Sequence, residues 1–402
     1  MAKKPKKRAA KELTRKQRSR LERERRMEKI LLWSVTAVGV VIVGVLVYGF
    51  VIEKIIKERE PVAIVNDVPI RTAEFQGRVR FTRAQIQQEL QRWLFEQQAI
   101  DPTDSDMQPY LEYAQGAVRD LQAQLATENA MTLGEQVLDQ LIQEALVRQE
   151  AERRGIVVAP EELQQEIELF FGYDRDPATP TPAPTATPPL TPTEVLTPTP
   201  TLTPLPTATP MTEAAFRERY DTYLGQTLKP LGISEQEYRS WVEVSLLLEE
   251  LQEQMVAEVP EMVEQVELWL LTAESEEQAN EFVARLDAGE DFQTLVDELA
   301  EDESGVSYGR ELDWYPKSLL EDRLGAELAD LAFSLEVGER SSPVPDENGT
   351  QYTVIGIVGR ETRELDEYFR QQLGSKAFQE WLEAQEVLVE RKDYQDRVPL
   401  EP

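Results

Sequence analysis

The side chains that most often carry out acid–base and nucleophilic chemistry in enzymes are missing from this chain. Its 402 residues include no histidine and no cysteine. The commonest general base, thiolate nucleophiles, disulfides and cysteine-bound zinc are therefore excluded. Any chemistry rests on carboxylates, hydroxyls or binding alone, and we expect no cofactor and no metal ion.

The charge is distributed very unevenly along the chain. Residues 1–29 contain seven lysines and seven arginines against four glutamates, a net charge of +10. Because the whole chain carries −32, the remainder carries −42. A basic segment is attracted to anionic lipid headgroups, whereas a strongly acidic one stays soluble and repels nucleic acid. We expect lipid headgroups as partners of the basic tail and no nucleic-acid partner.

An apolar segment follows the basic tail. Ile30–Ile52 spans 23 residues without a charge, and as a helix it would be about 35 Å long, enough to cross a bilayer core. The basic flank predicts a cytoplasmic N-terminus and an extracytoplasmic chain from Glu53 onward. A cleavable signal peptide is the alternative, but the run is long for one and no small-residue cleavage motif precedes Glu53. We predict a single-pass plasma-membrane protein.

Beyond this segment the pattern is mainly helical. A β-branched run, Val62–Val65, closed by Asn66-Asp67 predicts a strand and a tight turn. Thr72 stands where the N-cap of a following helix is expected. Apolar residues at three- and four-residue spacing predict an amphipathic helix over 133–154, which Gly155 ends.

A segment rich in proline and threonine interrupts the helices. Residues 177–210 contain almost only Thr, Pro, Ala and Leu, with Glu194 as the one charge. Proline at this density forbids helix and sheet ladders, so we expect an extended spacer of up to roughly 100 Å. Helices are expected to start at Pro160 before it and at Thr212 and Ser234 after it, the last with a Glu237 capping-box partner.

The last third of the chain alternates in the manner of strands. Val266, Leu268 and Leu270 alternate with Glu267, Trp269 and Leu271, and Thr353, Ile355 and Ile357 share one face of a later strand. Helical patterns lie between the two strands. This order predicts a small antiparallel sheet covered by helices, an α+β unit.

Two stretches resemble a known group of folding factors. VAIVNDVPIRTAEF and VLDQLIQEALVRQEAERRGIVV are similar to the opening strand and the long helix of the SurA/PrsA/PpiD group of membrane-associated or periplasmic folding factors. Asp67 stands where that family usually has glycine, and aspartate tolerates the left-handed conformation. The likeness covers residues 61–172 and 212–392.

A second likeness covers Gln265–Gly359. The words AGEDFQTLVDELAEDESG, GRELDWY and LAFSLEVGERSSPVPDENGTQYTVIGI resemble, in this order, a parvulin-type rotamase (PpiC) domain, a peptidyl-prolyl cis-trans isomerase. Arg310 and Asp313 replace two of the family's glycines, so the turn expected there can differ in shape.

The fold class that follows is mixed: one transmembrane helix, an all-α SurA-like chaperone domain and an α+β parvulin-like domain with a small antiparallel sheet. The expected segments, in chain order, are a basic cytoplasmic tail (1–29), a transmembrane anchor (30–52), a SurA-like domain (61–176), a Pro/Thr-rich disordered spacer (177–210), a helical continuation of the chaperone domain (211–260), a parvulin-like domain (261–360) and a closing helix on the chaperone domain (361–392).

The resemblance implies a site residue by residue. The slot for the substrate proline would be lined by Leu312, Leu324, Leu328 and Phe333, and the acid near the amide would be Asp302 or Glu303. Both family histidine positions are occupied by other residues, Trp269 and Thr353. For the apolar residues core packing is the alternative, and for the acids a solvated loop.

Rotation about a prolyl bond has a barrier of about 18–20 kcal/mol and requires no obligatory proton transfer. An apolar slot and displaced water are enough to favour the twisted amide. If the two strands are neighbours, the Trp269 N–H can donate to the Thr353 hydroxyl, which preserves shape without ionisable chemistry. We expect the isomerase activity to be weak or lost.

Chaperone action requires less than catalysis. An exposed apolar surface holds an unfolded polypeptide client reversibly, and Trp93, Phe95, Tyr110 and Tyr113 are candidates for it, with core packing as the alternative for each. Three functions stay open: an active isomerase, a chaperone with an inactive rotamase fold, and a structural surface protein with a glycosylated Pro/Thr stalk and a non-catalytic binding domain.

Overall fold

The computed structural model describes residues 57–101, 103–175, 211–300, 307–346 and 348–401, together with positions 33, 39–45, 47 and 48. The chain divides into two compact units. The first comprises Met1–Ile142 with Glu390–Pro402, and the second comprises Gln143–Val389.

A small sheet opens the first unit. Strands β1 (Pro61–Val65) and β2 (Val68–Arg71) form an antiparallel hairpin, and β7 (Val389–Arg391) lies on the other side of β1. Asn66 and Asp67 have φ angles of 48° and 66°, the left-handed pair that a two-residue hairpin turn requires. The predicted strand and turn are confirmed.

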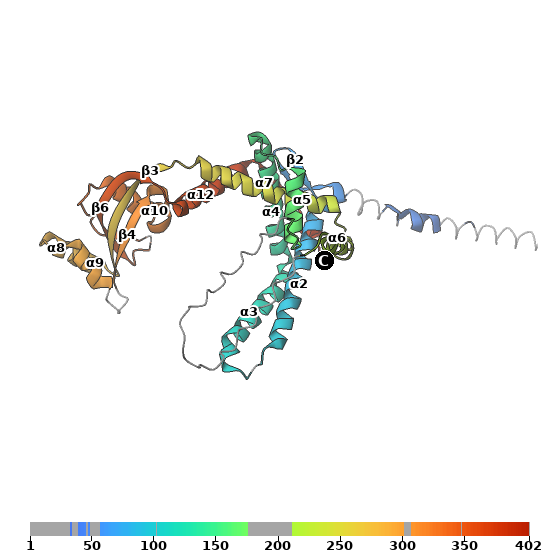
Figure 1. Cartoon of the computed structure of the whole chain (residues 1–402), viewed down its shortest axis with the longest axis horizontal. Coiled ribbons are helices and arrows are strands. Elements are labelled where there is room, and N and C mark those ends of the chain that lie inside the picture. Colours follow the sequence, from blue (N-terminus) through green and yellow to red (C-terminus); the bar gives the residue numbers. More distant parts are fainter. Residues whose placement is uncertain are drawn as a thin grey trace, which may run out of the picture. The chain divides into compact units, whose positions relative to one another are not determined.

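Helices α2 (Thr72–Ala99) and α3 (Gln108–Leu125) lie side by side as a second hairpin of this unit (Figure 1). The short helices η2 (Lys57–Arg59), η3 (Ser105–Met107) and η4 (Thr127–Asn129) flank it. The prediction of Thr72 as N-cap was wrong by one residue. The N-cap is Arg71, and the Thr72 hydroxyl instead donates to the Glu60 carbonyl at 2.8 Å, because the strand before the helix lies within its reach.

The second unit begins inside α4 (Ala130–Arg154). Gly155, at φ 76°, ends that helix, as predicted. Helices α5 (Pro160–Phe170), α6 (Glu213–Tyr223) and α7 (Glu235–Glu258) follow, with the π-helical turn η5 (Leu224–Leu228) before α7. The predicted Ser234–Glu237 capping box is present. Helix α12 (Glu367–Gln385) packs along α7, where Phe378 joins a core cluster with Leu251, and η6 (Glu386–Leu388) follows it.

An aromatic cluster joins α5, α6 and α7. The Phe171 ring contacts those of Phe216, Tyr220 and Tyr223, and Tyr173 stacks on Phe216 at 5.6 Å. The predicted spacer 177–210 lies outside the described residues, but this cluster holds its two flanks in contact. The described residues on either side, up to Arg175 and from Met211, therefore belong to one group of helices.

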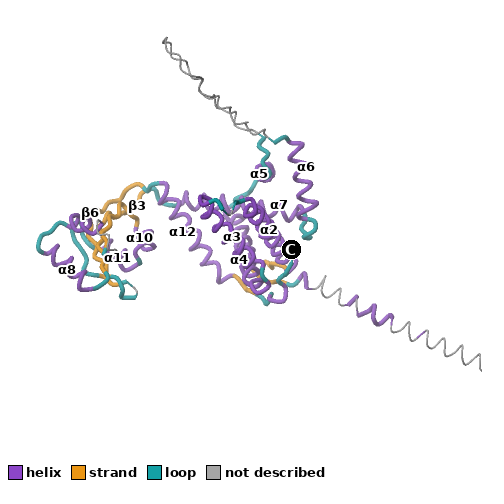
Figure 2. The backbone as a smooth tube through the Cα atoms, turned by 90° about the horizontal axis from the view of Figure 1, so that it is seen from below, coloured by secondary structure: helices purple, strands orange, loops and turns teal. Residues whose placement is uncertain are grey.

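The rest of the second unit contains a four-stranded antiparallel sheet in the order β4-β3-β6-β5. Its strands are β3 (Met262–Ala273), β4 (Tyr308–Pro316), β5 (Val344–Pro345) and β6 (Tyr352–Glu364). Its helices are α8 (Glu276–Asp287), α9 (Phe292–Ala300), α10 (Lys317–Leu324) and α11 (Ala326–Ser334). Figure 2 shows β3 and β6 of this sheet together with helices α8, α10 and α11. The segment GRELDWY, residues 309–315, was expected to contain a turn, but it lies entirely within strand β4.

Alternation along β3 gives the sheet two apolar faces. Leu268 and Leu270 enter one cluster with residues of α10 and α11, whereas Leu271 and Ala273 enter another with residues of α8 and α9. Each helical pair therefore covers its own face, and the predicted antiparallel sheet with helical cover is confirmed.

The predicted transmembrane helix, Ile30–Ile52, falls largely outside the described residues. Within the part of the chain that the structure describes, no helix combines the length and the apolar character that a membrane span needs.

Candidate functional site

Three of the four aromatic candidates form one cluster on the α2–α3 hairpin. The Trp93 ring lies 5.5 Å from that of Tyr113 and 6.5 Å from that of Tyr110. The exposed fractions of Tyr110 and Tyr113 are 40% and 64%. The structure therefore leaves the two tyrosine rings at the surface, whereas Trp93 is half-buried. We call Trp93, Tyr110 and Tyr113 the arm cluster.

Phe95 does not belong to the arm cluster. It is 73% exposed, and because it follows Trp93 by two residues, its side chain leaves α2 about 200° around the helix axis. The structure thus separates a ring that sequence reasoning grouped with the others.

In the four-stranded sheet, the residues proposed for the proline slot do come together. Leu312 is buried on β4, and Leu324, Leu328 and Phe333 pack against the same cluster from α10 and α11. The cluster also contains Leu268 and Ile355 of the two central strands. These side chains form the core of that face, so their packing serves the fold directly.

An arginine that the sequence did not single out holds one edge of this cluster. The Arg360 guanidinium donates to the carbonyls of Ala332 and Leu335 at 2.8 and 2.6 Å. It also lies 5.9 Å from the Phe333 ring centre. Cations near the last carbonyls of a helix are favourable, so Arg360 fixes the end of α11 and the ring beside it.

Thr353 lies on the same face of the sheet as the proposed slot. It stands opposite Thr272 in the β3–β6 ladder, and the two hydroxyl oxygens are 3.3 Å apart. Thr272 was not a candidate, although it continues the alternation of Leu268 and Leu270. At this position the ladder therefore brings together two hydroxyl groups, and hydroxyls of this kind do not titrate near neutral pH.

Trp269 lies on the other face. It stands opposite Gly356, its ring packs 5.9 Å from that of Phe292, and it belongs to the cluster under α8 and α9. A Cβ at Gly356 would lie 2.7 Å from the Phe292 ring, so the glycine makes room for this packing. The expected hydrogen bond between Trp269 and Thr353 was therefore wrong. The strands are neighbours, but the two residues are three ladder positions apart and point to opposite sides.

The candidate acids Asp302 and Glu303 fall in the segment 301–306, outside the described residues. Nearby carboxylates whose pKa is lowered have structural partners. Hydrogen bonds from Arg285 lower the pKa of Glu290 and Glu298, and backbone and hydroxyl donors at 349–351 lower that of Asp346. These groups serve ion pairing and a turn.

Comparison with known proteins agrees with this architecture. Residues 97–171 match the family model described as a SurA-like N-terminal domain, and residues 270–355 match the PPIC-type peptidyl-prolyl isomerase domain. The chain carries a SurA-like domain and a PPIC-type domain. Thr353 lies within the region matched to the PPIC-type domain, on the face of the apolar cluster, and Trp269 lies one residue before that region, on the α8–α9 face.

Curated relatives cover only part of the chain. Foldase protein PrsA of Geobacillus kaustophilus is 32% identical over 93 residues, 23% of this chain and 31% of that protein, so the match spans about a third of the relative's length. A PrsA peptidylprolyl isomerase structure from Bacillus cereus aligns with 17% identity and a TM-score of 0.34, covering 68% and 84% of the two chains. A SurA-like chaperone of Campylobacter jejuni aligns with 13% identity and a TM-score of 0.23, covering 83% and 98%.

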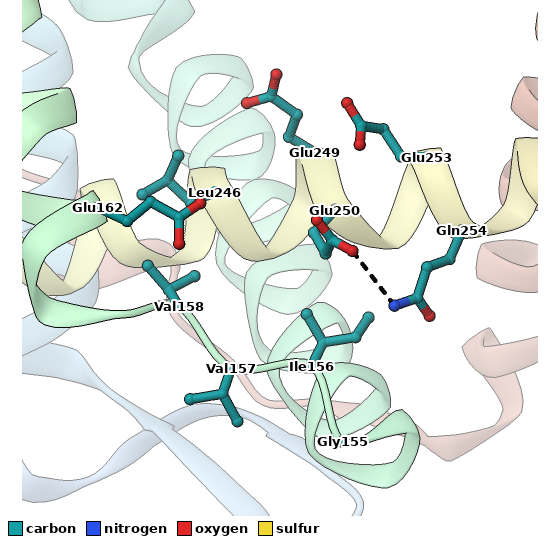
Figure 3. Close-up of a pocket in the computed structure, with 10 residues that line it drawn as sticks. All are labelled: Gly155, Ile156, Val157, Val158, Glu162, Leu246, Glu249, Glu250, Glu253 and Gln254. Carbon is teal, nitrogen blue, oxygen red and sulfur yellow. Dashed lines mark hydrogen bonds between the residues drawn. The ribbon is translucent and has the colours of Figure 1, made fainter.

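A pocket of about 460 Å³ lies between the segment after α4 and helix α7 (Figure 3). Ile156 and Val158 turn toward α7, whereas Val157 points away. Glu249 and Glu253 line it from α7, and neither has an ion pair within the described chain. The lining is acidic and mostly polar, and it was not predicted.

Proposed function

We propose that this chain is a membrane-anchored, extracytoplasmic folding factor that acts as a chaperone for exported proteins and has weak or no isomerase activity. One observation carries the proposal. The apolar cluster at the proposed proline slot survives in the PPIC-type domain, while the two family histidine positions point to opposite faces and carry no ionisable side chain.

The chemistry follows from what a prolyl site must do. Lowering the barrier requires the twisted amide to be bound more tightly than the planar one. The hydroxyls of Thr272 and Thr353 offer neutral hydrogen bonds, and the leucines proposed for the slot pack in the core of the same face of the sheet. A neutral site whose apolar residues pack in the core favours slow turnover, whereas reversible binding of unfolded chains needs exposed apolar surface alone.

The proposed location rests on the sequence. A 23-residue uncharged segment, Ile30–Ile52, follows a tail with a net charge of +10. By the positive-inside rule, that order supports the proposal that the acidic remainder lies outside the cytoplasm. The clients we propose are unfolded or newly exported polypeptides, and anionic lipid headgroups would contact the tail.

The test uses the full-length chain in detergent or reconstituted vesicles. A protease-coupled prolyl isomerisation assay should give turnover at least about a hundredfold below that of an ordinary parvulin, equivalent to about 2.7 kcal/mol in barrier height. The same preparation should slow the aggregation of a denatured model protein. Turnover at the ordinary rate would overturn the isomerase statement, and unchanged aggregation would overturn the chaperone statement.

Variants with histidine at the two family positions make this test more specific. In W269H/T353H the two imidazoles would lie on opposite faces, so we expect no gain in turnover. A matched pair, T272H/T353H, puts both imidazoles at directly opposed ladder positions. A gain confined to W269H/T353H would mean that the two positions act together, contrary to the β3–β6 register.

A further inference from the structure

We propose that the arm cluster is a docking surface for unfolded polypeptide segments that carry an aromatic or long aliphatic side chain beside a lysine or arginine. This inference rests on the proposed chaperone function and names its binding surface and the client chemistry. Three observations carry it: exposure, fixed ring positions and local charge.

The two tyrosines of the arm cluster lie outside the buried part of the α2–α3 hairpin. Helix α3 has 18 residues, of which it buries Ala114 and Val118. Tyr113 is 64% exposed and Tyr110 is 40% exposed. Because the buried residues of α3 are Ala114 and Val118, its two tyrosines keep exposed surface that a partner can contact. Exposed apolar groups gathered in one place are typical of interaction surfaces.

Hydrogen bonds hold two of the three rings in place. The Tyr110 hydroxyl donates to Glu96 at 2.8 Å, and the Trp93 N–H donates to Glu89 at 3.3 Å. Both donors are thereby satisfied without covering the exposed parts of the rings. Rings that are fixed before binding lose little conformational freedom on contact, so they can act as anchors for a flexible segment.

The charge around the arm cluster selects the partner. Residues 89–113 contain six carboxylates and one arginine, a net charge of −5. The arginine, Arg92, already pairs with Glu89 and lies 5.8 Å from the Trp93 ring centre. Asp106 and Glu112 are exposed and form no ion pair among the described residues. A client cation beside a docked apolar side chain would meet these carboxylates and the tyrosine faces.

The test measures binding of fluorescent peptides to the full-length chain by anisotropy. The probe is a short peptide with two phenylalanines flanked by lysines, compared with one in which glutamate replaces lysine. We expect the lysine peptide to bind at least about tenfold more tightly, and Y113S to weaken it about tenfold, the loss typical of an interface hot spot. The matched control Y368S removes a tyrosine that is 66% exposed in the second unit, and it should stay within about twofold.

Charge variants separate local from overall attraction. D106N/E112Q should weaken the lysine peptide about threefold to fivefold and reduce its advantage over the glutamate peptide. E249Q/E253Q removes two charges at the pocket beside α7 and should leave binding unchanged. Equal effects of both pairs would overturn the local charge argument, because the whole acidic chain would then be acting.

Crosslinking locates the contact. A photoreactive phenylalanine analogue at position 113 should crosslink to the lysine peptide, whereas the analogue at position 368 should not. If the chain binds peptides and slows aggregation but position 113 and Y113S have no effect, this inference fails and the proposed function stands. If no peptide binds and aggregation is unchanged, the proposed function itself fails. If Y113S instead converts a dimer to a monomer in sedimentation, a second copy occupies the surface and the inference is overturned.

Discussion

Aromatic rings gather in two places in this chain, and their surroundings differ. Around Phe171, rings from α5, α6 and α7 close over one another, and Phe171 itself is 7% exposed. In the arm cluster, Tyr113 is 64% exposed. The same chemistry therefore holds helices together in one region and remains available at the surface in the other.

The causes that raise the pKa of the tyrosines also differ between the two clusters. Burial raises the pKa of Tyr223 to about 12 and raises that of Tyr238 as well. In the arm cluster, the pKa of Tyr110 is raised mainly by its hydrogen bond to Glu96. Desolvation dominates in the closed cluster and a single polar partner in the open one. Aromatic content alone thus does not separate structure from binding.

The largest expected effect comes from opening the closed cluster. F171A should lower the free energy of unfolding by about 3–5 kcal/mol, because it removes a buried ring and leaves a cavity. The neighbouring F170A is the matched control, since Phe170 is 69% exposed and its loss should cost within about 0.5 kcal/mol. Urea denaturation followed by tyrosine fluorescence measures both. Equal losses would mean that the Phe171 ring is not the buried member.

A smaller effect is expected where helices approach closely. In G374A, the new Cβ would lie 2.8 Å from the Cα of Val256 on α7, and this clash should cost about 1–3 kcal/mol. G116A is the control on α3, where no atom lies within 4 Å, and better helix propensity should stabilise the hairpin by about 0.5–1 kcal/mol. Hydrogen exchange in α7 and in α3 should move in opposite directions. A common direction would contradict the packing difference.

Shortening the Pro/Thr segment should have a smaller effect still. Its flanks are held by the stack of Tyr173 on Phe216 and by the ion pair of Arg175 with Glu168. Replacing 177–210 with a Gly/Ser linker of about eight residues shortens the loop roughly fourfold, which should stabilise the helices by about 1 kcal/mol. The urea midpoint measures this. Loss of folding would mean that the segment takes part in the helical core.

Alkaline pH should lower the stability of the closed cluster through Tyr223, and this effect should begin near pH 10. Desolvation of the half-buried Tyr223 favours the neutral phenol in the folded state, whereas an ordinary tyrosine ionises near pH 10. The folded state therefore holds more protons than the unfolded state between pH 10 and about 12, and stability falls as pH rises through that range. The measurement is the free energy of unfolding against pH, with Y223F expected to reduce the slope. An identical slope in Y223F would assign the effect to other groups.

Local features of the fold could be predicted because a few adjacent residues determine them. Asn66-Asp67 specifies its turn, Gly155 ends a helix, and Ser234 with Glu237 forms a capping box. The pairing of Trp269 with Thr353 could not be predicted in the same way. It depends on strand register, which places Thr353 opposite Thr272, and register is a property of residues far apart in the chain. The position of Phe95 around the axis of α2 likewise directs its side chain away from the arm cluster.

The pairing of β7 with β1 has a consequence for the order in which the chain matures. Lys392 donates its backbone N–H to the carbonyl of Val62, and Arg397 reaches Glu60 and Thr72. A polypeptide made from its first residue onward must complete more than three hundred further residues before this edge is covered. Until then the early strand presents unpaired backbone, a template for wrong partners. A newly made molecule therefore needs protection at this strand edge until β7 is made. A product truncated before residue 389 would always leave the edge unpaired.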